Sequence, residues 1–424
     1  MPNYIPRIVD RELDELLTAL PAVALEGPKG VGKTASAERR ATTIFQLDTQ
    51  THRELAEADP AQLLEADPPV LLDEWQHVPA VWDAVRRAVD QDSRPNRYLL
   101  AGSMAPKSAP THTGAGRIVS LRMRPLALSE RGLATPTVSL EELLSGSRPE
   151  ISGATRVRLA DYAVEIIRSG FPGIRHLRGR ALRAQLDGYL ARVVDRDFME
   201  QGHPVRKPQA LRRWMAAYAA ASSTTTTLEK VRKAATSGEG DVLSKNTVIA
   251  YREVLTRLWI IEPVPGWLPS RSHLARPTQS PKHQLADPSL AARLLGISEE
   301  ALLSGDEPAS AVPRDGTFFG QLFESLLTLS VRAYAQSAEA QVRHLRTYDG
   351  RQEVDLIVER PDQRIVAVEI KLSSTVTDDD VANLTWLRDK LGTDLLDSLV
   401  VTTGPHAYRR KDGIAVVPAA LLGP

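Results

Sequence analysis

Two acidic residues and a lysine interrupt apolar stretches near the carboxyl end of the chain, in RQEVDLIVERPDQRIVAVEIKLSS at 351–374. Asp355 lies in one strand-like run. Glu369 and Lys371 lie two residues apart in the next run, so their side chains emerge on one face of a strand. Charged groups are costly in apolar surroundings unless they are paired or used. Carboxylates and a lysine in this pattern could bind Mg²⁺ and activate water for phosphodiester cleavage.

A further acid precedes this hairpin. The segment FFGQLFESLLTLSVRAYA, at 318–335, predicts an amphipathic helix that carries Glu324 among apolar residues. A helix glutamate, a strand aspartate and an Asp/Glu-x-Lys on the hairpin partner form the PD-(D/E)XK nuclease arrangement. We therefore predict that Glu324, Asp355 and Glu369 bind Mg²⁺, and that Lys371 orients or activates the attacking water.

Three other interpretations of this segment stay open. The hairpin could be an exposed edge whose charges are solvated. It could belong to a nuclease-like relic that binds DNA without cutting it. Lys371 could also pair with Glu369 in a purely structural role.

A second group of chemical residues lies near the amino end. AVALEGPKGVGKT, at 22–34, places the pattern G-x-x-x-x-G-K-T between an apolar strand and a helix, the context of a phosphate-binding loop. Lys33 would neutralise the β- and γ-phosphates of ATP, and Thr34 would help to hold Mg²⁺. The residues predicted to bind the nucleotide are Gly27, Pro28, Lys29, Gly30, Val31, Gly32, Lys33 and Thr34.

Polar residues at two further strand ends would complete an ATPase site. VLLDE, at 70–74, ends in Asp73, which would hold Mg²⁺ through water, and Glu74, which would be the general base. YLLAGS, at 98–103, ends in Ser103, which would sense the γ-phosphate. Arg117 follows a Gly-rich turn, and we predict that it acts on the ATP of a neighbouring subunit, which implies a homo-oligomer; the alternative is a surface ion pair.

The chain also resembles a known family. GPKGVGKT, LLDEWQHVP, YLLAGS, GRIVSLRMRPLALSE, SGFP and VVDRDF are similar to segments of bacterial and archaeal AAA+ ATPases fused to a C-terminal domain of unknown function. The resemblance covers nearly the whole chain and implies an AAA+ P-loop domain that uses ATP and Mg²⁺. The C-terminal domain of this family is nuclease-like in some members and degenerate in others. Trp75 replaces a usual β-branched residue and Ala101 a usual threonine, and neither change removes a catalytic group.

Residues 151–290 carry mainly helical patterns. The segment at 227–267 predicts helix, turn, helix and strand, the order of a winged helix. Ser244 would cap the recognition helix. Its exposed start would carry Lys245, Asn246 and Thr247, and the wing candidate at 266–283 carries Arg271, Arg276 and Lys282 for phosphate contacts. The alternative is a packing module, and Asp195 and Asp197 are interpreted as capped or ion-paired helix ends rather than catalytic residues.

Length and composition limit the remaining choices. A chain of 424 residues is too long for one ordinary core. We predict an α/β protein with an AAA+ P-loop parallel sheet at 1–135, a helical and winged-helix domain at 150–295, and a small mixed α/β nuclease-like domain at 310–424. The chain has no cysteine and a formal net charge of zero, so DNA binding would require a local basic patch.

The N-terminal segment carries charge where a signal peptide needs an apolar region, and no apolar run reaches the ~18 residues of a membrane span. We therefore expect a cytoplasmic protein without a membrane partner. The combined prediction is an ATP-hydrolysing protein that acts on DNA through a Mg²⁺-dependent nuclease-like domain under ATPase control. Two alternatives stay open: an ATP-switched regulator that binds DNA or protein over a non-cleaving scaffold, and a toxin-like nuclease restrained by a partner protein.

Overall fold

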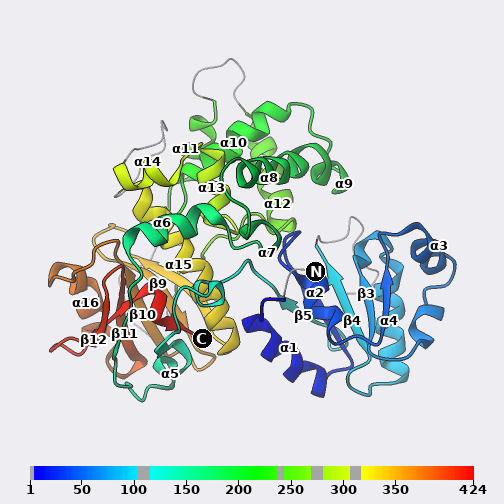
Figure 1. Ribbon diagram of the computed structural model, residues 1–424, viewed down its shortest axis with the longest axis horizontal. Helices are drawn as coiled ribbons and strands as arrows, with labels where there is room; N and C mark the ends of the chain where they lie inside the picture. Colours follow the sequence, from blue (N-terminus) through cyan, green and yellow to red (C-terminus); the bar gives the residue numbers. More distant parts are fainter. Residues whose placement is uncertain (1–3, 104–114, 237–242, 269–279, 306–316) are drawn as a thin grey trace.

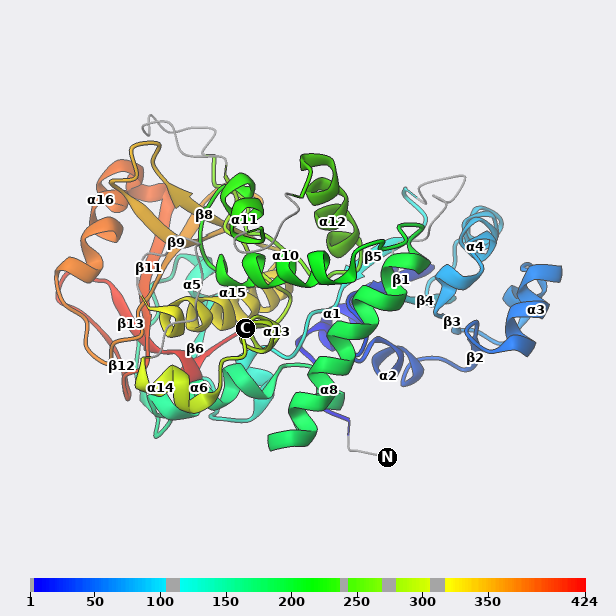
Figure 2. The ribbon, with the colours of Figure 1, turned by 90° about the horizontal axis from the view of Figure 1, so that it is seen from above.

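The computed structural model describes residues 4–103, 115–236, 243–268, 280–305 and 317–424. It contains an N-terminal unit built on a parallel sheet, a helical unit and a C-terminal unit built on a mixed sheet (Figure 1). The helical unit lies above the two sheets and contacts both of them (Figures 1 and 2). This arrangement confirms the predicted fold class of parallel sheet, helical middle and mixed α/β C-terminus.

The N-terminal sheet has the strand order β2-β3-β4-β1-β5, and all its pairings are parallel. Its central strands are continuous buried apolar runs, as expected for a parallel sheet covered on both faces. Because the strands are parallel, the residues after β1, β3 and β4 meet at one edge. The strands are β1 (Ala22–Glu26), β2 (Thr43–Gln46), β3 (Val70–Asp73), β4 (Tyr98–Gly102) and β5 (Val119–Arg122), and the helices are α1 (Ile8–Ala19), α2 (Lys33–Glu38), α3 (Gln50–Ala58) and α4 (Ala80–Gln91).

The helical unit contains the predicted pair of helices before the wing segment. Ser244 begins α12 (Lys245–Arg257), and its hydroxyl accepts the backbone N–H of Thr247 at 3.1 Å, as the sequence predicted. A π-helical turn, Val193–Asp197, joins α8 to α9. The other helices of this unit are α6 (Leu159–Arg168), α7 (Pro172–Arg175), α8 (Gly179–Arg192), α9 (Phe198–Glu200), α10 (Pro208–Ala220), α11 (Leu228–Ala234), α13 (Pro288–Leu294) and α14 (Glu299–Ser304).

The C-terminal sheet has the strand order β7-β12-β13-β11-β10-β9-β8. The predicted hairpin is its antiparallel pair β9 (Glu353–Glu359) and β10 (Ile365–Ile370). The linker after the first sheet also joins this unit, since β7 (Gly153–Ala154) pairs with β12 and β6 (Val138–Ser139) pairs with β14. The remaining elements are α5 (Leu140–Ser145), α15 (Phe318–Ser337), β8 (Gln341–Arg346), α16 (Ala382–Leu391), β11 (Leu395–Thr402), β12 (His406–Arg409), β13 (Ala415–Pro418) and β14 (Leu422–Gly423).

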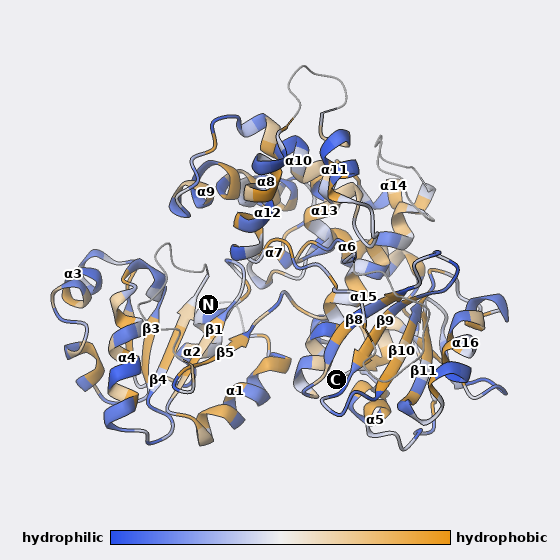
Figure 3. Cartoon of the chain, turned by 180° about the vertical axis from the view of Figure 1, so that it is seen from behind, coloured by the Kyte–Doolittle hydropathy of each residue, from blue (hydrophilic) through white to orange (hydrophobic). Residues whose placement is uncertain are grey.

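Apolar residues concentrate in the strands of both sheets and in the buried helix α15, while the outer helices present polar faces (Figure 3). Burial of this apolar surface is the main favourable term in folding. No helix among the described residues is long and apolar enough to cross a membrane.

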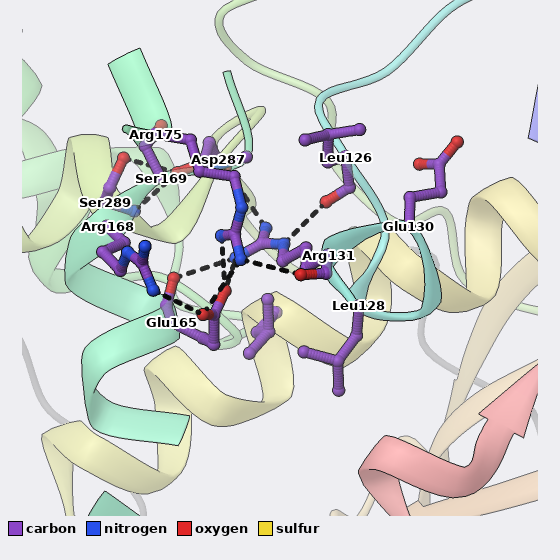
Figure 4. Close-up of polar contacts among 12 residues, drawn as sticks. Leu126, Leu128, Glu130, Arg131, Glu165, Arg168, Ser169, Arg175, Asp287 and Ser289 are labelled. Atoms are coloured by element: carbon purple, nitrogen blue, oxygen red, sulfur yellow. Dashed lines mark hydrogen bonds and ion pairs between the residues drawn. The ribbon is translucent and has the colours of Figure 1, made fainter. Parts of the chain in front are cut away.

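A buried ionic network joins the N-terminal unit to the helical unit (Figure 4). The guanidinium of Arg131 donates to the backbone oxygens of Leu126 (2.9 Å) and Glu165 (2.8 Å), and lies 3.4 Å from the Glu165 carboxylate. It also lies 3.7 Å from the carboxylate of Asp287, which accepts the N–H of Gly170 at 2.7 Å. The side chains of Arg131 and Asp287 are fully buried, so each supplies the charge that the other needs.

Position 170 accommodates only glycine because atoms of this network surround its Cα. A Cβ at this position would lie 2.7 Å from the Arg131 guanidinium, 2.8 Å from the Asp287 carboxylate and 2.9 Å from the Leu126 oxygen. This contact explains the glycine of the SGFP segment. The following Phe171 then packs against Tyr189, with ring centroids 5.1 Å apart, beside the phosphate-binding loop.

Replacing Arg131 tests how much this network contributes to the free energy of unfolding. Arg131→Met leaves Glu165 and Asp287 buried with less positive charge, and we expect the free energy of unfolding to fall by about 3–5 kcal/mol. Chemical denaturation followed by circular dichroism measures the loss. The control is Arg117→Met, which removes a solvent-exposed ion pair with Asp90 and should have little effect. Equal losses in the two variants would contradict the assignment.

Candidate functional site

The phosphate-binding loop connects β1 to α2 and depends on close backbone packing. A Cβ at Gly27 would lie 2.2 Å from the Met123 oxygen, which excludes a larger residue there. Gly32 has a φ of 100°, in the left-handed region that glycine adopts without strain, and it begins α2. The ammonium of Lys33 donates to the backbone oxygens of Gly27 (2.8 Å) and Pro28 (3.0 Å). Lys33 therefore lies inside the loop, where phosphate oxygens would replace these carbonyls.

Lys33 is nearly fully buried, and its electrostatic environment favours an anionic ligand. Burial lowers the pKa of Lys33 to about 8, and the nearby carboxylate of Glu74 offsets only part of this effect. In this loop the ammonium interacts with neutral carbonyls rather than with a bonded carboxylate. A polyphosphate would supply the missing negative charge.

Thr34 and Asp73 lie together at the same strand edge. The Thr34 hydroxyl lies 3.0 Å and 3.1 Å from the two carboxylate oxygens of Asp73. Burial, with the adjacent charge of Glu74, raises the pKa of Asp73 to about 6. A buried carboxylate beside a hydroxyl is an oxygen donor pair that suits Mg²⁺, so the two residues fit the predicted metal role.

Glu74 and Ser103 are also brought together. Glu74 has a φ of 53°, an uncommon left-handed conformation for a non-glycine residue and one that often occurs at functional sites. The Ser103 hydroxyl donates to the Glu74 carboxylate at 2.9 Å, and the amide of Gln76 donates to both side chains. Gln76 was not among the predicted site residues. Its position two residues after Glu74 was the only signal for it.

The arginines after the Gly-rich turn have separate partners. Arg117 forms a half-exposed ion pair with Asp90 of α4 at 2.8 Å, so within one chain it is a surface residue, and its action on a neighbouring subunit stays a prediction. Arg124 binds Glu262 of the helical unit at 2.7 Å, and Arg122 lies over the ring of Trp259 at 3.8 Å. These last two arginines connect the end of β5 to the helical unit.

Glu262 is the centre of that second connection. Arg332 of α15 lies 3.7 Å from its carboxylate and also donates to its backbone oxygen. Burial alone would raise the pKa of Glu262, but Arg124, Arg332 and Arg122 hold it well below its ordinary value. The ionised carboxylate therefore links residues from all three units.

The helical unit contacts the phosphate-binding loop directly. The Lys29 ammonium binds the carboxylate of Asp197 at 2.7 Å and lies 3.5 Å from that of Glu200. The Tyr189 hydroxyl donates to the backbone oxygen of Lys29 at 3.3 Å. An ion pair is the role that the sequence analysis gave Asp197, and Asp195 likewise pairs with Arg212. The sequence could not show that the partner of Asp197 is the phosphate-binding loop.

The predicted C-terminal site also contains Lys282, a residue of the wing candidate. The Lys282 ammonium lies 3.0 Å from a carboxylate oxygen of Glu324, 3.0 Å from Glu353 and 2.9 Å from Asp355. Lys282 is 1% exposed, so the prediction that it contacts phosphate from a wing is wrong. Burial alone would lower the pKa of Lys282, but the carboxylates of Asp355, Glu324 and Glu353 raise it well above its ordinary value, and the group stays charged.

Glu369 and Lys371 lie beside this cluster. One carboxylate oxygen of Glu369 is 3.4 Å from the Lys371 ammonium, and the other is buried without a hydrogen-bond partner. Burial and the charge of Asp355 raise the pKa of Glu369 well above its ordinary value. Asp355 in turn accepts the N–H of Ile370 at 2.9 Å.

The geometry adds a buried lysine to the predicted cluster. Glu324 and Asp355 do converge, but they converge on Lys282 rather than on a space for a cation. Across the described residues, no group of three or more His, Asp or Glu side chains is arranged to hold a metal ion. Binding of Mg²⁺ by Glu324, Asp355 and Glu369 stays a prediction, and in this structure the Lys282 ammonium lies between two of these carboxylates.

The wing segment packs against the C-terminal sheet. Its two sides pair at Ile261–Leu285 and Val264–Lys282, and Trp267 and His344 of β8 bond through their backbones at 2.7 Å. Its Arg271 and Arg276 lie outside the described residues. At the start of α12, Lys245 and Asn246 are exposed and Thr247 is partly exposed, which matches the predicted exposed start of that helix.

Comparisons with known proteins agree with this division of the chain. Residues 20–131 match the model of the AAA domain, which supports an AAA-type P-loop ATPase. Residues 159–301 and 319–422 match two domains of unknown function, DUF8612 and DUF4143. The chain is 24% identical to the uncharacterized proteins Rv2008c of Mycobacterium tuberculosis and Mb2031c of Mycobacterium bovis, over 96% of its own length and 82% of theirs.

The pKa of Lys33 predicts how nucleotide binding depends on pH. Below about pH 8, Lys33 of the nucleotide-free protein is mostly charged. Above this pH Lys33 is mostly neutral, and it must take up a proton before its ammonium can bind the phosphates of ATP. The affinity for Mg²⁺-free ATP should therefore fall by about 5–10-fold between about pH 7.5 and 9. Titration with a fluorescent ATP analogue measures this, and Lys33→Met should bind weakly without the pH dependence. A flat wild-type profile would contradict the prediction.

Proposed function

We propose that this protein is an ATP-driven switch that acts on DNA, and that its C-terminal unit is a non-cleaving scaffold. The observation that carries the proposal is the ion pair between Lys29, inside the phosphate-binding loop, and Asp197 of the helical unit. A residue of the predicted phosphate-binding loop is thus also bonded to a second unit. Nucleotide binding would then change how that unit is held.

In the proposed ATPase site each side chain has one task. Lys33 would neutralise the β- and γ-phosphates, and Thr34 and Asp73 would hold Mg²⁺, which compensates phosphate charge when it is bound. Glu74 would accept a proton from the attacking water. Ser103 and Gln76 hold its carboxylate in the free protein, so the γ-phosphate would compete with Glu74 for these donors.

The switch would act through competition for Lys29. ATP brings several negative charges to the loop, and they would attract the Lys29 ammonium away from Asp197. Asp197 is 3% exposed, so a carboxylate that loses this partner is costly unless the π-helical turn moves. The element that would respond is therefore the stretch from Tyr189 to Glu200.

A groove follows this stretch directly. It has a volume of about 1030 Å³ and lies between the segment 198–213 and the start of α12. Its basic lining residues are His203, Arg206, Lys207 and Arg213, and none of the described residues that line it is acidic. A groove lined by these basic side chains at the exposed start of a helix-turn-helix suits a polyanion, and we propose that it binds DNA.

Nuclease activity is the second candidate. It is favoured by the gathering of Glu324, Asp355, Glu369 and Lys371 at one end of the C-terminal sheet. It is opposed by the ammonium of Lys282, which lies between two of these carboxylates. We therefore propose the scaffold role, in which DNA binding does not lead to cleavage.

Hydrogen exchange tests the switch. Glu74→Gln should keep ATP bound while turnover falls by roughly 10²–10⁴-fold. In that variant ATP should speed amide exchange at 189–201, because Lys29 leaves Asp197. Asp197→Asn should show fast exchange already without ATP, and Lys33→Ala should show no response to ATP. Exchange in Glu74→Gln that stays unchanged or slows when ATP binds would overturn the switch.

DNA binding tests the groove. Arg206→Glu combined with Lys207→Glu should weaken binding by at least about tenfold and reduce the slope of log Kd against log salt by about 2, as expected for two lost phosphate contacts. Fluorescence anisotropy with a labelled duplex and a labelled single strand measures both quantities. The matched control reverses two exposed charges of the C-terminal unit, Arg351→Glu and Lys411→Glu. An equal loss in the control, or no binding by the wild type, would exclude the groove.

A further inference from the structure

The position of Lys282 is fixed by the backbone around it. Its N–H donates to the Val264 oxygen at 2.9 Å, and its own oxygen accepts the Val264 N–H at 2.9 Å. The next residue, His283, donates to the Thr224 oxygen, and its oxygen accepts the N–H of Ser223. The side chain therefore enters the C-terminal unit from a backbone that is bonded on both sides to the helical unit.

The Lys282 ammonium is surrounded by carboxyl groups. The ammonium has three N–H donors, and three carboxylate oxygens lie within 3.0 Å of it, on Glu324, Glu353 and Asp355. Glu353 also binds Arg346 at 3.0 Å. The ammonium thus donates to Glu324 and Asp355, and a carboxylate oxygen of Glu353 at 3.0 Å adds a third negative neighbour.

The balance of charges in the cluster does not favour binding of a divalent cation. It contains four carboxyl groups, those of Glu324, Glu353, Asp355 and Glu369, and three cationic groups, those of Lys282, Arg346 and Lys371. A divalent ion among these acids would lie beside the Lys282 ammonium, and like charges at such a distance repel strongly in a buried site.

We propose that this cluster is a binding site for a primary ammonium group, which Lys282 supplies from the helical unit, and that it holds no divalent metal while Lys282 is in place. The C-terminal unit then uses nuclease-like carboxylates to fasten the helical unit. The inference rests on the contacts of Lys282 and not on the ATP switch, so either can fail without the other.

The choice between an ammonium and a metal can be measured directly. In nucleotide-free wild-type protein, titration with Mn²⁺ followed by electron paramagnetic resonance should show no site that Asp355→Asn removes. Lys282→Ala should unfold at a lower temperature and should gain such a site. A D355N-sensitive Mn²⁺ site in the wild type would overturn the proposal.

Chemical rescue provides the second readout. Lys282→Ala removes three methylene groups and the ammonium, which n-propylammonium matches, so n-propylammonium chloride should raise its unfolding temperature toward that of the wild type. Neither the wild type nor Lys282→Met, whose side chain still fills the space, should respond beyond the effect of sodium chloride at equal ionic strength. A folded Lys282→Ala protein that is not stabilised by the amine would overturn the proposal. If this variant does not fold, the wild-type Mn²⁺ titration still decides, since absence of the site supports the proposal.

Discussion

The buried pairing of Arg131 with Glu165 and Asp287 is the constraint on which the arrangement of the units depends. A guanidinium without exposure cannot be solvated, so Arg131 must remain where both carboxylates reach it. That requirement fixes the SGFP turn, since the Gly170 N–H bonds Asp287 and the Gly170 oxygen accepts the Leu126 N–H at 2.7 Å. The turn places Phe171 and, through it, Tyr189 against the phosphate-binding loop.

The same constraint extends to the C-terminal unit through a short segment. Lys282 and Asp287 are five residues apart, and between them the Gln284 oxygen accepts the Glu262 N–H at 3.0 Å. One end of the segment thus completes the carboxylate cluster, and the other end completes the Arg131 network. Glu262 binds Arg124 from the N-terminal unit and Arg332 from α15. A displacement of the helical unit at the phosphate-binding loop would therefore have to be absorbed by the π-helical turn or transmitted along 282–287.

Local patterns were sufficient to predict the main elements and to bring together the residues of the predicted nucleotide site. Lys33, Thr34, Asp73, Glu74 and Ser103 follow three strands of a parallel sheet, and topology brings such positions together without further information. The hairpin of β9 and β10 was predicted because its apolar runs and its turn are adjacent in sequence. In both cases the distance along the chain, or the rule for parallel strands, determines the distance in space.

The sequence could not predict which charges meet across units. Lys282 and Asp355 are 73 positions apart, Lys29 and Asp197 are 168 apart, and Arg131 and Asp287 belong to segments with no shared periodicity. Lys371 was predicted to be functional because it interrupts an apolar strand, whereas Lys282 stands in a loop-like segment and was therefore assigned to the surface. A buried lysine is recognised only when its carboxylates are known, because burial without them would cost too much.

The predicted nucleotide site and the C-terminal carboxylate cluster differ in whether their buried charged groups already have ionic partners in the chain. In the N-terminal unit the Lys33 ammonium bonds only carbonyl oxygens, and the Asp73 carboxylate has a hydroxyl as its bonded side-chain partner. Both groups are buried and gain most from a ligand that brings phosphate and a cation together. In the C-terminal cluster a lysine from the same chain already provides that charge at 2.9–3.0 Å from three carboxylates. External ligands are therefore expected at the first site, whereas at the second Glu324, Glu353 and Asp355 already have a cationic partner from the same chain. In the role proposed above, these carboxylates stabilise the position of the helical unit instead of activating water.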